Sequence, residues 1–137
     1  MTRFLLDTNI ISEIHKPKPH GAVVVWFEGL RDEQVCLSAV TLFELQHGIE
    51  RTRTQDAAKA AAIEAWVGEL ENSSTVLPMD GRCFREAARM MVGKQEDLFY
   101  DAMIAATARI HGLTVATRNE KDFKRLRVEI INPFKSN

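Results

Sequence analysis

The sequence has few cysteines and no long apolar run, and each absence excludes a class of protein. Only Cys36 and Cys83 occur among the 137 residues, far apart and in apolar-rich segments. This favours buried free thiols over a disulfide framework or a zinc site. No apolar run approaches the roughly 20 residues that a membrane-spanning helix needs, and the N-terminus lacks the zones of a signal peptide. We therefore expect a protein of the cytoplasm with no membrane segment.

The chain also lacks an excess of positive charge and the common nucleotide-binding motifs. Its 18 Lys and Arg residues face 19 Asp and Glu residues, giving a net charge of -1. This argues against a protein that binds nucleic acid over its whole surface, but it is compatible with local basic patches. Neither a G-x-G-x-x-G nor a P-loop motif is present. Length and composition fit one folded domain over residues 1–137.

Hydrophobic periodicity predicts strands that alternate with helices. In the helix expected over 80–92, Phe84, Ala87, Ala88 and Met91 should face inward. This alternation is typical of an α/β fold with a mostly parallel sheet of four to five strands and helices on both faces. The expected strands are residues 3–7, 35–39, 74–79, 113–117 and 128–131, and the expected helices are 8–14, 22–30, one around 42–49 directly after the second strand, 55–70, 80–92 and 98–111.

Polar side chains follow the ends of the predicted strands. Asp7 ends the first strand, Glu44 lies early in the helix after the second, and Asp101 lies in the first turn of the helix before the fourth. Ligands bind beyond the carboxyl ends of parallel strands, so these carboxylates can meet at one edge. Clustered carboxylates repel one another unless a cation neutralises them, and hard oxygen ligands favour Mg²⁺ or Mn²⁺.

Each of these carboxylates also has an ordinary structural explanation. Asp7 alone could be a helix N-cap, Glu44 a solvated helix residue, and Asp101 a first-turn carboxylate favoured by the helix dipole. Their occurrence together at one sheet edge favours a metal site.

Four Lys and Arg residues after the fourth strand could be a solvated face or could bind phosphates: Lys121, Lys124, Arg125 and Arg127.

Four ordered segments give the chain a specific resemblance. "FLLDTNIISEI", "TLFELQHGI", "YDAMIAATA" and "VATRNEKDF" resemble the motifs of PIN-domain ribonucleases, in particular the VapC and FitB-like toxins of type II toxin-antitoxin pairs. The resemblance covers essentially the whole chain and implies a three-layer α/β/α fold. It implies Asp7 and Asp101 as direct metal ligands and Glu44 as the third acid, which also helps to activate water. Thr8 and Asn9 would brace the first carboxylate.

The fourth motif departs from the family pattern. Many relatives have a fourth acid two residues after the threonine, where this chain has Asn119, and the next acid is Asp122. Asparagine can accept a hydrogen bond but carries no charge. We therefore expect Asn119 to take the fourth catalytic position and one metal ion to be well held. Asp122 would be either a substitute ligand or, the interpretation we favour, a cap of the following turn.

The resemblance implies a metal-dependent endoribonuclease that cuts tRNA or rRNA. It also implies a homodimer and an antitoxin partner, itself able to bind DNA, whose C-terminal segment covers the cleft. Two alternatives stay open on the residues alone. One is phosphoryl transfer through an aspartyl intermediate at Asp7, which would want a second carboxylate at the position of Asn9. The other is a binding module that has kept the scaffold and lost catalysis.

Overall fold

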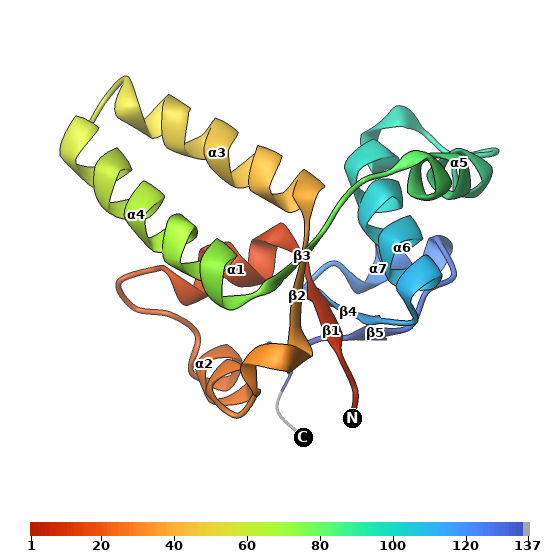
Figure 1. The fold of residues 1–137 in the computed structure, drawn as a ribbon, viewed down its shortest axis with the longest axis horizontal. Helices are drawn as coiled ribbons and strands as arrows, with labels where there is room; N and C mark the ends of the chain where they lie inside the picture. Colours follow the sequence, from red (N-terminus) through yellow and green to blue (C-terminus); the bar gives the residue numbers. More distant parts are fainter. Residues whose placement is uncertain (136–137) are drawn as a thin grey trace.

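The computed structural model describes residues 1–135, so the last two residues of the predicted domain lie outside it. Strands and helices alternate along the chain, as the sequence predicts (Figure 1). The strands are β1 (Phe4–Leu6), β2 (Val35–Ser38), β3 (Thr75–Leu77), β4 (Thr114–Ala116) and β5 (Ile130–Ile131). The helices are α1 (Thr8–Ile14), α2 (Gly21–Glu28), α3 (Ala39–Arg53), α4 (Ala57–Ser73), α5 (Gly81–Met90), α6 (Phe99–His111) and α7 (Glu120–Arg125), with short 3-10 turns η1 (Asp32–Gln34) and η2 (Glu96–Leu98).

The five strands form one parallel sheet in the order β3-β2-β1-β4-β5. The first strand lies in the middle, so the chain leaves it toward β2 on one side and later returns to β4 on the other. Crevices for ligands form at such a reversal, beyond the carboxyl ends of the strands. The predicted parallel α/β sheet is confirmed.

Both faces of the sheet are covered, which gives the expected three layers (Figure 1). Alternate residues of a strand point to opposite faces. Leu5 joins the core beneath α5, α6 and α7, whereas Phe4 and Leu6 join the core beneath α1, α2 and α4. A strand buried on both faces reads as a continuous apolar run, and this explains the unbroken hydrophobicity of β1.

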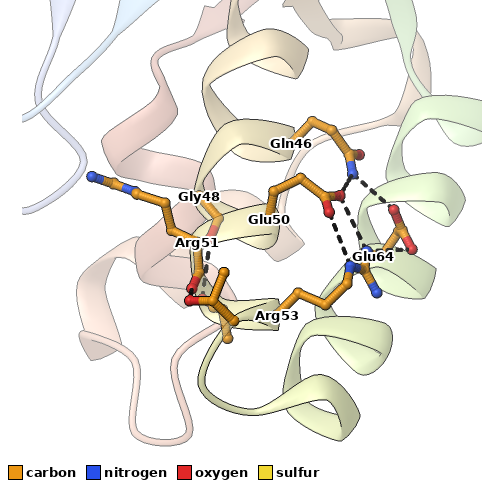
Figure 2. A network of polar contacts seen from close by, with 8 residues as sticks. Gln46, Gly48, Glu50, Arg51, Arg53 and Glu64 are labelled. Atoms are coloured by element: carbon orange, nitrogen blue, oxygen red, sulfur yellow. Dashed lines mark hydrogen bonds and ion pairs between the residues drawn. The ribbon is translucent and has the colours of Figure 1, made fainter.

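Helices α3 and α4 form an antiparallel hairpin beside the sheet (Figure 1). Their inner faces share a small apolar cluster that contains Ile49, Ala60 and Val67. Figure 2 shows a polar network that joins the two helices at their outer side. Arg53 donates to Glu50 at 3.0 Å and to Glu64 at 2.9 Å. Exposed pairs of this kind add little stability, so the apolar cluster holds the hairpin.

Two details of the sequence prediction were wrong. Residues after β4 form a six-residue helix, α7, where no helix was expected. In α5 the buried residues are Cys83, Ala87 and Met90, while Phe84 is 49% exposed. The predicted inward face of α5 was therefore rotated. None of the helices over residues 1–135 combines the length and the apolar character needed to cross a membrane.

Candidate active site

A pocket of about 430 Å³ lies at the carboxyl ends of β1 and β4, where the strand order reverses. Three acidic residues reach this pocket from different helices. Asp7 directly precedes α1, Glu44 lies in α3, and Asp101 lies in the first turn of α6. The predicted site residues Asp7, Glu44, Asp101 and Asn119 all line it. The remaining lining residues are Thr8, Asn9, Ser12, Glu13, Lys16, Arg118 and Phe134.

Asp7 is the most tightly held of the acids. Its side chain is buried, with 5% of its surface exposed. One carboxylate oxygen accepts the Thr8 N–H at 2.8 Å, and the other accepts the Thr117 hydroxyl at 2.7 Å and the Asn9 amide at 3.1 Å. Burial raises the pKa of Asp7, while these donors lower it in part. Asp7 is both the N-cap of α1 and a member of the acidic pocket, so the ordinary and the functional explanations hold together.

Asp101 lies in the first turn of α6 and faces the same pocket with fewer partners. The Asn119 amide donates to it at 3.3 Å and to Asp122 at 2.9 Å. Burial is the largest cause that raises the pKa of Asp101 to about 7, and the negative charges of Asp7, Asp122, Glu44 and Asp97 add to it. A cation in the pocket would offset this repulsion and favour the ionised form.

Glu44 comes from the early part of α3 and is held by Thr8. The Thr8 hydroxyl donates to Glu44 at 2.8 Å. The expectation that Thr8 and Asn9 both brace the first carboxylate is therefore modified: Asn9 does so with its amide, whereas Thr8 uses its backbone N–H on Asp7 and its hydroxyl on Glu44. Asp7 and Glu44 are thus connected through a single residue.

The acidic residues fit a divalent cation that keeps much of its water. Over residues 1–135, no three His, Cys, Asp and Glu side chains are arranged so that they alone could hold a metal ion. A carboxylate offers about four lone-pair positions, and Asp7 uses three of them. Asp101 uses one, so both aspartates can still accept a ligand bond. Mg²⁺ commonly binds through one or two carboxylates and several waters, which this arrangement suits.

Asp122 and the predicted basic cluster lie outside the lining of the pocket. Asp122 sits in the first turn of α7, accepts from the Asn119 side chain and adds negative charge near Asp101. Lys124 lies 3.9 Å from Glu120, and Arg125 lies 3.9 Å from Asp122.

Thr117 and Arg118, which directly follow β4, had been assigned no role from the sequence. Thr117 donates to Asp7 and accepts the Asn119 N–H at 2.9 Å, so it links β4 to the acidic pocket. Arg118 lines the pocket from the same loop. Their position directly after a buried strand was the available signal, because polar residues there face the ligand edge of a parallel sheet.

The chain is similar to known proteins along nearly its whole length. The PIN domain family matches residues 4–129. VapC ribonuclease Y4jK of Sinorhizobium fredii is 35% identical, over 95% of this chain and 96% of that protein. A protein named tRNA(fMet)-specific endonuclease VapC, of Shigella flexneri, is 35% identical over 92% and 93% of the two chains.

The fold is shared with solved structures of the same group. The crystal structure of FitAcB from Neisseria gonorrhoeae superposes with a TM-score of 0.85 at 34% identity and covers 96% of this chain and 98% of that one. Other similar structures are complexes of FitAB or VapBC with DNA. The chain therefore belongs to the PIN domain family, among its VapC and FitB-like toxins.

Proposed function

We propose that this protein is a divalent-metal-dependent endoribonuclease, the toxin of a toxin-antitoxin pair, which hydrolyses phosphodiester bonds of tRNA or rRNA in the cytoplasm. The observation that carries the proposal is the meeting of Asp7, Glu44 and Asp101 in one pocket, with the pKa of Asp101 raised to about 7. Such crowding favours cation binding. The tRNA specificity in the name of the Shigella flexneri relative supports this class of substrate.

Asp7 and Asp101 would hold the ion, Mg²⁺ or Mn²⁺, with Glu44 nearby. When bound, such an ion offsets negative charge on the phosphoryl oxygens and makes water easier to deprotonate. Asp7 is fixed by three donors, and Glu44 is oriented by the Thr8 hydroxyl. Glu44 is then placed to accept the proton of the attacking water, and the Asn119 amide holds Asp101 toward the pocket.

The test is RNA cleavage by the purified chain with Mg²⁺ or Mn²⁺. Asp7→Asn should abolish cleavage and keep the fold, because the amide preserves the shape of the side chain while removing its charge. Asp32→Asn is the matched control, since Asp32 lies in η1, directly before the amino end of β2 and outside the pocket. Undiminished cleavage by Asp7→Asn would refute the assignment. Absence of divalent-cation binding in calorimetry would favour the non-catalytic binding module.

We also propose that an antitoxin segment covers the pocket. A groove of about 500 Å³ shares Thr8, Ser12 and Glu44 with it. The groove continues between α3 and α4 over apolar side chains, including Leu45, Ile49, Ile63, Trp66 and Val67. An amphipathic segment ending in a basic residue would complement this surface. Binding of the antitoxin from the neighbouring reading frame should weaken in Trp66→Ala but not in Val25→Ala on α2, and equal affinities would contradict this placement.

The expected homodimer has a suitable surface on α3, α5 and α6. Exposed aromatic side chains from α3, α5 and α6 gather there: Phe43, Phe84, Phe99 and Tyr100. Exposed apolar patches of this kind mark association sites. Because Phe84 is 49% exposed, Phe84→Ser should lower the dimer fraction in sedimentation without unfolding the chain. Val25→Ser, at a position 73% exposed on α2, is the control.

A further inference from the structure

Arg118 occupies an unusual position for a cation beside three carboxylates. It follows β4 and lines the pocket that contains Asp7, Glu44 and Asp101. Its guanidinium lies 4.6 Å from the centre of the Phe134 ring. Over residues 1–135, no carboxylate comes within 4.0 Å of that guanidinium. Arg118 thus lines the acidic pocket without a direct ion pair, although its charge contributes to lowering the pKa of Glu13.

The backbone and the ring both fix this arginine. Its N–H donates to the Asn9 side chain at 3.3 Å, and the same side chain donates to Asp7 at 3.1 Å. Phe134 in turn lies against His20, with ring centres 5.2 Å apart. An aromatic face attracts a cation but accepts no conventional hydrogen bond from it. The N–H groups of the Arg118 guanidinium therefore remain able to donate to an incoming anion.

The other cation of the pocket has its charge largely satisfied. Lys16 lies 2.8 Å from Glu13, a buried carboxylate that also accepts the His20 N–H at 3.0 Å. Glu13 offsets the charge of Lys16, so Arg118 supplies the net positive charge of these three lining residues. The cations after residue 120 that were candidates from the sequence do not line the pocket.

We infer that Arg118, supported by Phe134, binds a phosphate of the RNA backbone next to the scissile one. This inference rests on the proposed ribonuclease function. A planar guanidinium matches two phosphate oxygens at once, which an ammonium cannot do. The carboxylates with their cation would face the scissile phosphate, while Arg118, which lines the same pocket, would fix the register of the strand. Arg118 is then a substrate-binding residue with no part in proton transfer.

The experiment measures binding of a short random-sequence RNA by fluorescence anisotropy over a series of salt concentrations. In this binding assay Ca²⁺ replaces Mg²⁺ as a hard divalent cation that prefers oxygen ligands. Arg118→Gln should weaken binding roughly tenfold. It should also reduce the slope of log affinity against log salt by about 0.7, the value for one lost contact to a single strand. In cleavage assays with Mg²⁺, KM should rise while kcat stays unchanged.

Three further variants separate charge from geometry. Arg118→Lys should keep the salt slope but not restore the affinity, and Phe134→Leu should weaken binding at an unchanged slope because the charge is still present. Lys124→Gln removes one charge outside the pocket and should change neither affinity nor slope.

Each outcome decides a separate question. An unchanged affinity and slope in Arg118→Gln, or the same loss in Lys124→Gln, would overturn the role of Arg118 while leaving the ribonuclease assignment intact. If the unaltered protein neither binds nor cleaves RNA, the proposed function itself fails. Phe134→Leu keeps the inference testable should Arg118→Gln not fold, because an unchanged affinity in that variant would contradict it.

Discussion

The titration of Asp101 predicts how the stability of the metal-free protein depends on pH. Burial and four neighbouring carboxylates raise the pKa of Asp101 from 3.8 to about 7 in the folded chain. Between these values the folded state holds a proton that the unfolded state has released. The free energy of unfolding must therefore fall as pH rises through this window. At about 1.36 kcal/mol per unit, the full shift corresponds to about 4 kcal/mol, and solvent screening of this half-buried group reduces it to about 2 kcal/mol.

The assay is urea unfolding in EDTA at intervals between about pH 4 and pH 8. Asp101→Asn cannot titrate, so its advantage over the unaltered protein should grow from near zero at the acid end to about 2 kcal/mol above pH 7. Asp32→Asn, at an exposed position in η1 and outside the charges that act on Asp101, should show no such growth. Parallel curves for the unaltered protein and Asp101→Asn would refute the electrostatic reasoning. Added Mg²⁺ should stabilise the unaltered protein increasingly as pH rises, because the ion binds the ionised form.

Other residues of the pocket give three shorter predictions. Thr117→Val removes the hydroxyl that donates to Asp7 and should lower the free energy of unfolding by about 1.5–3 kcal/mol, more at high pH than in acid. Thr117→Ser is the control, and an equal loss at both pH values would assign the effect to packing. Asn119→Asp adds a carboxylate and should strengthen Mg²⁺ binding in calorimetry, so unchanged affinity would place position 119 outside the ion's reach. Thr8→Val frees Glu44 and should lower kcat roughly tenfold with Mg²⁺ affinity unchanged; the reverse result would make Glu44 a ligand.

The centre of the sheet was predictable because β1, β2 and β4 are largely buried and read as short apolar runs, whereas the edge strands β3 and β5 are only partly buried. All five expected strands are present, each shorter than predicted. Helix α7 was missed because six residues, most of them charged, contain too little apolar periodicity to signal a helix. The inward face of α5 was predicted wrongly because Cys83 and Phe84 are adjacent and both apolar, so the apolar pattern fits either residue in the interior. Packing against α6 selects the smaller Cys83 for the interior and leaves the phenylalanine exposed.

The members of the pocket were predictable from strand ends, but their pairing was not. Strand ends and helix starts place Asp7, Glu44, Asp101 and Asn119 at one edge, and all four line one pocket. The bond between the Thr8 hydroxyl and Glu44 depends on how α3 lies against α1. That packing joins residues 36 positions apart and has no local sequence signal.

The two aspartates have different surroundings, and this divides their roles. Asp7 receives donors from α1 and from the loop after β4, so the fold fixes its position before any ion arrives. Asp101 has one weak donor at 3.3 Å and four repelling neighbours. A bound cation would therefore be the main stabiliser of its charge. The same bonds that fix Asp7 pass through Asn9 to the backbone of Arg118. Asp7, the proposed metal ligand, and Arg118, the proposed phosphate-binding residue, are thus held by one side chain, so a change at Asn9 should loosen both together.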